Sequence, residues 1–186
     1  ILVQTFDEIK EKIEAVEKYV EWVQIDVMDG IFVNNETWHN PKDLKDFKTR
    51  VKIEAHLMVQ CPEKIFDDWL KVADRIIIHF ESKITNRELG IRELIEKCHK
   101  NKVEFGLALN PETHWAVVTP FFKDLDLVLL MSVQPGWGGQ EMKEWVLEKA
   151  ENKREKGYRG NIEIDGGVND ENIKKVLLDI AKEEKT

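Results

Sequence analysis

The sequence predicts an α/β fold in which helices cover a parallel sheet. Short runs of apolar and β-branched residues alternate with charged segments of helical period along all 186 residues. The runs are apolar over most of their length, which is typical of parallel strands buried on both faces. Regular alternation of strand and helix calls for a parallel sheet, either open or closed into a barrel.

Seven strands are expected from these runs. They are Ile1–Gln4, Trp22–Val27, Val51–Val59, Arg75–Phe80, Val103–Leu109, Leu127–Val133 and Asn161–Asp165. An eighth strand and its helix would close a (β/α)₈ barrel, typically about 250 residues long. No Gly-rich nucleotide-binding fingerprint follows the first strand, which disfavours a doubly wound nucleotide-binding fold. No linker or repeat interrupts the pattern, so residues 1–186 are interpreted as a single barrel domain.

Six helices are expected between and after the strands. They are Phe6–Tyr19, Pro62–Val72, Asn86–Lys100, Glu112–Phe122, Glu141–Lys156 and Asn169–Lys182, with a further short helix at Pro41–Phe47. Pro62 suits the first turn of its helix, and Asn169 can cap the last one. Gly157 follows the fifth helix, where a left-handed stop is expected.

The formal net charge of −8 disfavours nonspecific binding to nucleic acid or to anionic membranes. An anionic substrate must therefore be held by local groups. No apolar run approaches the roughly 18 residues of a membrane span, and no signal-peptide pattern opens the chain. We expect a cytoplasmic protein. Cys61 and Cys98 match neither a disulfide framework nor a metal motif, and are interpreted as buried or half-buried thiols.

Polar residues gather at the ends of the predicted strands, where barrel enzymes place their sites. Gln24 and Asp26 share one face of their strand by alternation. Asp26 and Asp165 suit a reaction that needs a base and an acid on opposite faces of a planar intermediate. His56 and nearby carboxylates could hold a divalent cation that stabilises an enediolate oxygen. The alternatives are a helix-capping role for Asp165, a core role for His56, and a simple turn at Asp29.

Two glycine-rich loops could bind a phosphate through backbone N–H groups, without a cationic side chain. Their glycines are Gly136, Gly138 and Gly139 after the sixth strand, and Gly166 and Gly167 after the seventh. The alternative is a pair of tight strand-to-helix turns. Three methionines stand at strand ends, where they would fill the core or wall a substrate pocket. They are Met28, Met58 and Met131.

Seven stretches in order carry a resemblance to one family. They are Ile25–Gly30 with Phe32 and Val33, His56–Val59, His79 with Glu81, Gly106–Thr113, Met131–Val133, Pro135–Gln140 and Asp165–Asn169. In this order and spacing the chain resembles the ribulose-phosphate 3-epimerase family over nearly its whole length. The resemblance implies a (β/α)₈ TIM barrel of the ribulose-phosphate-binding type that interconverts ribulose 5-phosphate and xylulose 5-phosphate.

The resemblance also implies the site residues. The two aspartates that act as acid and base in the family match Asp26 and Asp165. The family's metal ligands are these aspartates and two histidines, of which one matches His56 and the other falls at Gln24. A glutamine carbonyl is a harder and weaker ligand than imidazole for zinc, iron, manganese or cobalt. Gln24 could therefore weaken metal binding, shift the metal preference, or leave the site empty.

Two departures concern the termini. The serine of the family's first strand would precede Ile1, and nothing matches the Gly-Ser pair of the family's eighth strand. We therefore expect the natural protein to contain more sequence, including the start of the first strand and an eighth strand.

Three functions stay open from the sequence. The first is C3 epimerisation of a ketopentose phosphate with one divalent metal ion. The second is epimerisation of another ketose phosphate, of the allulose 6-phosphate type. The third is a catalytically silent barrel that binds a sugar phosphate. The expected partners are a small sugar phosphate and further copies of the chain in a homo-oligomer.

Overall fold

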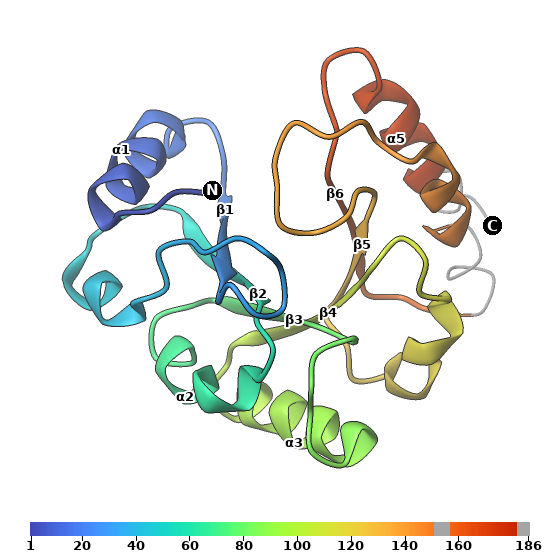
Figure 1. Ribbon diagram of the computed structural model, residues 1–186, viewed down its shortest axis with the longest axis horizontal. Helices are drawn as coiled ribbons and strands as arrows, with labels where there is room; N and C mark the ends of the chain where they lie inside the picture. The colour runs from blue at the N-terminus through green and yellow to red at the C-terminus, as the bar shows by residue number, and fades with distance from the viewer. Residues whose placement is uncertain (151–156, 182–186) are drawn as a thin grey trace. The chain divides into compact units, whose positions relative to one another are not determined.

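The computed structural model describes residues 1–150 and 157–181. The chain divides into two compact units, Ile1–Phe105 and Gly106–Thr186. Figure 1 labels the helices and strands of both. Each unit contains parallel strands separated by helical segments, which is the predicted α/β pattern.

The strands of the first unit follow one another in chain order. β1 (Trp22–Met28) pairs in parallel with β2 (Lys52–Met58), and β2 pairs in parallel with β3 (Arg75–His79). β4 (Glu104–Leu109) begins at the end of this unit. All five residues of β3 are buried, as predicted for an apolar parallel strand. These strands confirm their predicted positions to within one or two residues.

Helix α1 (Phe6–Val16) begins at its predicted residue because Thr5 and Glu8 form a capping box. The backbone N–H of Glu8 donates to Thr5 Oγ1 at 3.3 Å, and the N–H of Thr5 donates to Glu8 Oε2 at 2.9 Å. Ile9 lies on the buried face of the helix. The polar cap therefore sets where the helix starts, and the apolar face holds it against the unit's core.

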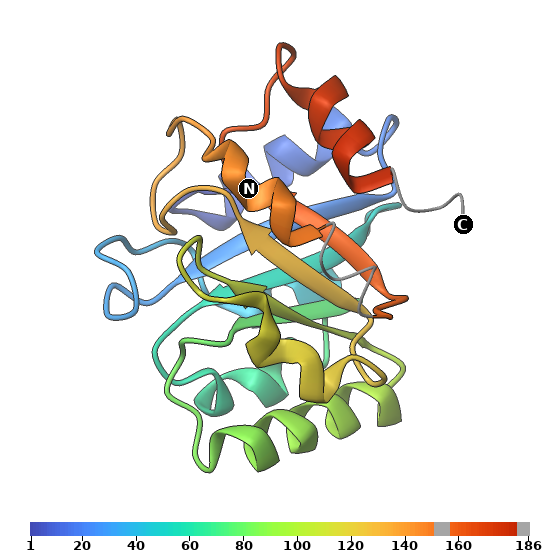
Figure 2. The same cartoon turned by 90° about the vertical axis from the view of Figure 1, so that its right-hand side faces the viewer.

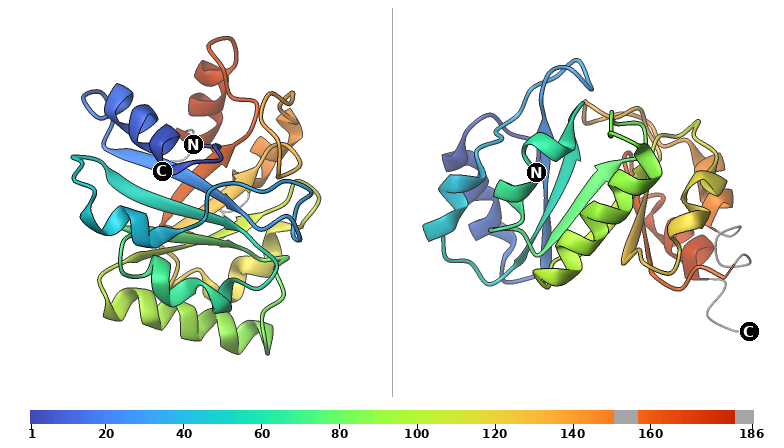
Figure 3. Two further views of the ribbon diagram at one scale, coloured as in Figure 1. Left: turned by 60° about the vertical axis from the view of Figure 1, so that its left-hand side comes forward. Right: turned by 90° about the horizontal axis from the view of Figure 1, so that it is seen from below.

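The remaining helical segments of the first unit are α3 (Arg87–Lys100) and three short elements. The right-hand view of Figure 3 shows α3 running alongside β3. The predicted short helix is a 3₁₀ helix, Pro41–Asp46. The single helix predicted over Pro62–Val72 is wrong in part. The chain forms a 3₁₀ turn, Pro62–Lys64, and then a short α2 (Phe66–Trp69), because the N–H of Ile65 bonds back only three residues, to Pro62.

The strand predicted at Ile1–Gln4 is wrong, because this segment forms no regular strand. Its backbone does make hydrogen bonds. The N–H of Asp26 donates to the Ile1 carbonyl at 3.0 Å, and the N–H of Trp38 donates to the Val3 carbonyl at 2.9 Å. Since the two bonds lead to different parts of the chain, they do not build a ladder with one partner strand.

The second unit holds β4, β5 (Leu127–Met131) and β6 (Asn161–Asp165), paired in parallel in chain order. β6 confirms its predicted bounds. Helix α5 (Ile173–Ala181) lies beside β6 in Figure 2. Val176 of α5 packs in a buried cluster with Met142 and Leu147, against the half-buried Ile164 of β6.

Two predicted helices of the second unit differ from the structure. Over Glu112–Phe122 the chain forms only a 3₁₀ helix, Trp115–Phe121. Pro120 lies inside this segment and has no backbone N–H for an α-helical hydrogen bond. The Lys149 amine donates to the Thr113 carbonyl at 2.7 Å and to the carbonyls of Asn110 and Pro111.

Of the predicted Glu141–Lys156 helix, Glu144–Val146 is a 3₁₀ helix and residues 147–150 are α-helical. Its last part, 151–156, lies outside the described residues, as does Lys182 at the end of the helix predicted over Asn169–Lys182.

Several smaller predictions are confirmed. Gly157 has a left-handed φ of +90°. Cys61 is a half-buried thiol and Cys98 a buried one. Over the described ranges, no helix is both long and apolar enough to cross a membrane. One further prediction is wrong: α5 begins at Ile173 and not at Asn169, whose Oδ1 accepts the N–H groups of Glu171 and Asn172 in the turn before the helix.

Candidate functional site

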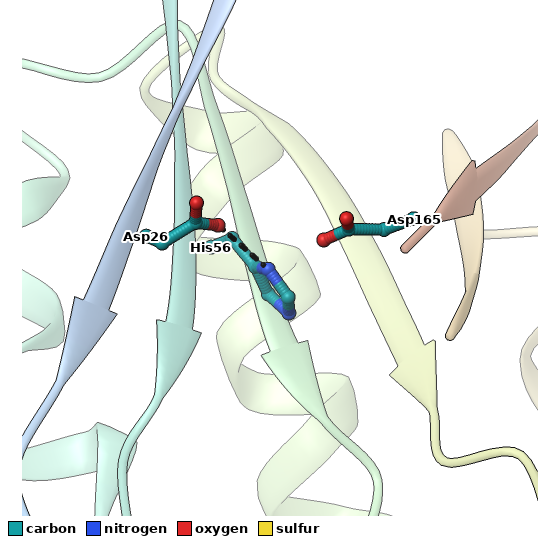
Figure 4. Close-up of side chains that lie close together, drawn as sticks. All are labelled: Asp26, His56 and Asp165. Carbon is teal, nitrogen blue, oxygen red and sulfur yellow. Dashed lines mark hydrogen bonds and ion pairs between the residues drawn. The ribbon is translucent and has the colours of Figure 1, made fainter. Parts of the chain in front are cut away.

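The first part of the site lies on neighbouring positions of β1 and β2. Gln24, Asp26 and Met28 alternate along β1, so their side chains share one face. The register places Asp26 directly beside His56 of β2. Asp26 Oδ1 lies 3.2 Å from His56 Nδ1, as the dashed line in Figure 4 marks. The ring of His56 is fully buried, and the side chain of Asp26 is 14% exposed. The carboxylate is therefore the part of this pair that solvent or a ligand can reach.

Gln24 contacts the same carboxylate from one strand position away. Its amide nitrogen Nε2 donates to Asp26 Oδ1 at 2.8 Å. The amino nitrogen of Ile1 lies 3.3 Å from the other oxygen, Asp26 Oδ2. Gln24 is therefore a hydrogen-bond donor to Asp26, and it contacts the carboxylate through its amide nitrogen.

His79 and Glu81 extend the site, and sequence reasoning assigned neither of them a role. His79 Nε2 lies 2.9 Å from His56 Nε2, and His79 Nδ1 lies 3.3 Å from Glu81 Oε2. The ring of Phe32 lies over His79, with centroids 4.8 Å apart. Strand alternation could have indicated this contact in the sequence. His79 is the last residue of β3 and lies on the same face as Arg75 and Ile77.

Met28 and Met58 lie together next to these polar groups. They are 1% and 2% exposed and pack with Val33, while the half-buried Phe32 packs against the cluster. Both methionines are therefore core residues in this structure, at the carboxyl ends of β1 and β2.

Asp29 makes the turn that the sequence allowed. Its Oδ1 accepts the N–H groups of Ile31 at 2.9 Å and Phe32 at 2.8 Å, and its Oδ2 accepts the N–H of Gln60 at 2.7 Å. Burial raises the pKa of Asp29, but the N–H donors of Phe32, Gln60 and Ile31 outweigh burial, and the pKa lies below its ordinary value. Asp29 thus ties the segment after β1 to the segment after β2.

The second part of the site lies at the carboxyl end of β6. Asp165 is the last residue of this strand and is half-buried. The register places it beside Met131, the buried last residue of β5. The backbone N–H of Ser132 donates to the Asp165 carbonyl at 2.7 Å, and the buried Ser132 hydroxyl donates to the same carbonyl at 3.0 Å. Ser132, to which sequence reasoning assigned no role, therefore fixes the backbone that carries Asp165.

The two glycine loops differ in what their glycines contact. A Cβ added at Gly138 or Gly139 would meet nothing within 4 Å. A Cβ at Gly166 would lie 2.4 Å from Val133, and one at Gly167 would lie 2.5 Å from the backbone of Met142. Gly166 and Gly167 are required by packing and by positive φ angles of +108° and +62°, while Gly138 and Gly139 border open space. Gly136 is buried and has a φ of +118°.

Comparison with known proteins identifies the family of the chain. A family model described as "Ribulose-phosphate 3 epimerase family" matches residues 1–182. The chain belongs to the ribulose-phosphate 3-epimerase family. This assignment, with the parallel strands and alternating helical segments described above, confirms the predicted α/β fold of the (β/α)-barrel class.

Curated members of the epimerase family match along most of the chain. The chain is 34% identical over 185 residues to the chloroplastic ribulose-5-phosphate-3-epimerase of Arabidopsis thaliana, with 95% of the chain and 64% of that protein covered. It is 36% identical over 186 residues to the ribulose-phosphate 3-epimerase of Bacillus subtilis, with 95% and 83% covered. The chain thus spans about two thirds to four fifths of the length of these relatives.

A solved structure supports the fold independently of sequence. The N-terminal domain of a putative aldolase from Bacteroides vulgatus superimposes with a TM-score of 0.52 at 14% identity, covering 88% of this chain and 58% of that one. At this low identity the likeness concerns the fold alone.

Proposed function

We propose that this protein epimerises C3 of a ketopentose phosphate, interconverting ribulose 5-phosphate and xylulose 5-phosphate. The observation that carries the proposal is the position of Asp26, beside His56 on the shared face of β1 and β2, in a chain of the ribulose-phosphate 3-epimerase family. The two units are proposed to be parts of one barrel domain, in which Asp165 faces the same substrate as Asp26.

The reaction needs one ionised and one protonated carboxyl group. The ionised group removes the proton from C3, so the C–H electron pair forms a C2–C3 double bond and the ketone oxygen takes the negative charge. The protonated group then delivers a proton to the opposite face of C3. Asp26 and Asp165 are proposed to play these two roles, each contributing in the range of about 10²–10⁴-fold that is typical of positioned acids and bases.

Asp26, His56 and Asp165 are proposed to hold one divalent metal ion together, as the resemblance to the family implies. Carboxylate oxygen and imidazole nitrogen are ligands for zinc, iron, manganese and cobalt. When bound, such an ion would stabilise the negative charge of the enediolate. The side chains themselves orient the site, since Gln24 and His56 both contact Asp26 Oδ1.

The phosphate is proposed to bind the backbone N–H groups of the glycine loops. Gly138 and Gly139 support this role because the space in front of them is open. Gly166 and Gly167 follow Asp165 directly, so a phosphate held there would lie close to the reacting part of the sugar.

A second candidate function is a silent sugar-phosphate-binding barrel. The contact between Gln24 and Asp26 favours it, because a side chain that donates N–H to the carboxylate stands where the family has a histidine ligand.

One assay separates the two functions. Ribulose 5-phosphate is incubated with the protein in deuterated water, and deuterium at C3 is followed by NMR. The epimerase exchanges this hydrogen, and Asp165→Asn abolishes the formation of xylulose 5-phosphate, because inversion at C3 needs both aspartates. Binding of the sugar phosphate without any exchange by the wild type would support the silent barrel instead.

A further inference from the structure

We propose that Glu112 is a positioning residue that holds the loop after β5 in the shape that receives the substrate's phosphate. This loop comprises residues 133–143. The inference rests on the proposed function, because it takes the phosphate to bind at Gly138 and Gly139. Glu112 lies in the segment after β4, and all the residues concerned belong to the second unit. Its carboxylate acts through the loop and not on the phosphate itself.

The packing of its glycines does not fix the shape of this loop. The N–H of Lys143 donates to the Ser132 carbonyl at 2.8 Å, which closes the loop at its base. Beyond this bond, a Cβ added at Gly138 or Gly139 would meet nothing within 4 Å. Gly139 has a φ of +74°, which glycine adopts without strain. Because glycine also adopts other conformations easily, the shape of the loop depends on contacts made by other residues.

One set of these contacts lies within the loop. The amide nitrogen Nε2 of Gln140 donates to the carbonyl of Gln134 at 2.7 Å and to that of Trp137 at 2.8 Å. The two bonds hold the first half of the loop to the second half. An anion binds to backbone N–H groups and is repelled by carbonyl oxygens. Bonds that hold two carbonyls to Gln140 therefore favour a loop that can bind a phosphate.

Glu112 holds both ends of the loop from outside it. Its Oε2 accepts from the side-chain amide nitrogen of Gln134 at 2.7 Å, and its Oε1 accepts from the Lys143 amine at 2.8 Å. One carboxylate thus ties a residue at the start of the loop and the residue at its end to the segment after β4. The bond from Lys143, more than any other contact, lowers the pKa of Glu112 below its ordinary value. Glu112 is therefore ionised at neutral pH and can accept both bonds.

Lys149 holds the segment that carries Glu112. Its amine donates to the carbonyls of Asn110, Pro111 and Thr113, on either side of Glu112 in the sequence. Glu112 is therefore attached to a backbone segment that has contacts of its own. An exposed ion pair such as that of Glu112 contributes little to the stability of a fold. Its effect is expected in the shape of the loop, and so in the affinity for phosphate.

The negative charge of Glu112 makes the sign of the effect informative. A carboxylate near a phosphate repels it, so loss of the charge alone would tighten phosphate binding. Loss of the bonds to Gln134 and Lys143 has the opposite effect, because a loop that is no longer held must be ordered when the ligand binds, at a cost in affinity. Replacing Glu112 by alanine therefore separates a positioning role from a purely electrostatic one.

The test titrates the wild type and Glu112→Ala with inorganic phosphate and follows the backbone N–H signals of Gly138 and Gly139 by NMR. We expect phosphate to shift these signals and to bind the variant about 2–10-fold more weakly, the range for one lost hydrogen bond. The KM for ribulose 5-phosphate should rise by the same factor with little change in kcat. Glu144→Ala is the matched control and should leave both values unchanged. Glu144 is 61% exposed against 60% for Glu112, and it pairs with Lys175 of α5.

A charge swap gives a second measurement. In the double variant Glu112→Lys with Lys143→Glu the ion pair is reversed, and the new lysine can donate to the amide oxygen of Gln134. We expect it to recover most of the phosphate affinity that Glu112→Ala loses, and failure to recover any would count against the inference.

Three results would overturn the inference while C3 exchange by the wild type still stood. They are phosphate that leaves the Gly138 and Gly139 signals unchanged, phosphate binding by Glu112→Ala that is equal or tighter, and an equal loss in Glu144→Ala. A wild type that binds phosphate at these glycines without epimerising ribulose 5-phosphate would overturn the proposed function. The phosphate titrations would then still decide the role of Glu112.

Discussion

The first unit contains two polar clusters at opposite ends of its strands, and they differ in the charges of their side chains. The amino-end cluster consists of Glu54, Arg75 and Glu104, near the starts of β2, β3 and β4. The carboxyl-end cluster consists of five side chains on β1 and β2, at the end of β3 and just after it. They are Gln24, Asp26, His56, His79 and Glu81.

The amino-end cluster is built around the buried Arg75. Arg75 donates to Glu54 at 2.5 Å and through Nε to Glu104 at 2.8 Å, and it also lies over the Trp22 ring at 4.1 Å. Burial lowers the pKa of Arg75, but its bonds to Glu54 and Glu104 outweigh burial and raise it above its ordinary value. A guanidinium that bonds to carboxylates on two neighbouring strands in this way holds the strands together.

The carboxyl-end cluster differs in its charges. None of its five side chains carries a permanent positive charge, and two of them are carboxylates. The comparison teaches that buried polarity alone does not identify a site. Polar side chains at the carboxyl ends of barrel strands are the stronger indication, because barrel enzymes place their sites there.

The largest expected effect is loss of reaction on changing the carboxyl-end cluster. Asp26→Asn should slow C3–H exchange by about 10²–10⁴-fold, because an amide cannot take up the proton. Its unfolding free energy should change far less than that of an Arg75 variant, since Asn keeps the shape and still accepts from Gln24. NMR exchange and urea unfolding measure the two effects. If the Asp26→Asn protein exchanged C3–H as fast as the wild type, Asp26 would not be an acid or base of the reaction.

The amino-end cluster should respond in stability. Arg75→Met should lower the unfolding free energy by about 3–5 kcal/mol, because Glu54 is left buried without its cation. Exchange by the molecules that remain folded should stay unchanged. The double variant Arg75→Met with Glu54→Leu is the control and should recover most of the loss, as both charges are then gone. If the double variant were as unstable as the single one, packing and not charge would explain the cluster.

Asp29 is a third case. It is a carboxylate near the site, and its charge is stabilised by backbone N–H groups. Asp29→Ala should lower the unfolding free energy by about 1–3 kcal/mol at neutral pH. The pKa of Asp29 lies below its ordinary value in the folded protein. Its contribution is therefore complete above the unfolded pKa of about 3.9 and is lost as pH falls through the folded pKa. Urea unfolding across the acid range should show wild type and variant converging there. A constant difference would contradict this assignment.

The smallest expected effect concerns Gln24. Gln24→His should raise the affinity for Zn²⁺ or Mn²⁺ several-fold, because imidazole is the better ligand for these ions. Stability should change little, since a histidine can also donate to Asp26. Calorimetric titration of both proteins measures the change, with His39→Gln, an exposed histidine of the same unit, as the control. Equal affinities for the wild type and Gln24→His would mean that this position does not reach the metal.

Strand positions were predictable because they depend on local composition. β6 matches its predicted bounds, and β1 to β5 match to within a few residues, since each is a short apolar run between polar segments. The helical segments were less predictable. The Glu112–Phe122 segment forms only a 3₁₀ helix and contains Pro120, which has no backbone N–H for an α-helical hydrogen bond. The Ile1–Gln4 strand fails because its hydrogen bonds go to separate partners.

By itself the sequence determined the α/β class, the family and the residues at the strand ends, because alternation and motif spacing are local properties of the chain. Only the tertiary structure decided that Gln24 meets Asp26 as a donor, and that His79 and Glu81 continue the chain of contacts from His56. These contacts join residues on different strands or depend on side-chain rotation. Sequence order records which residues are present, but the register between strands decides which atoms face each other.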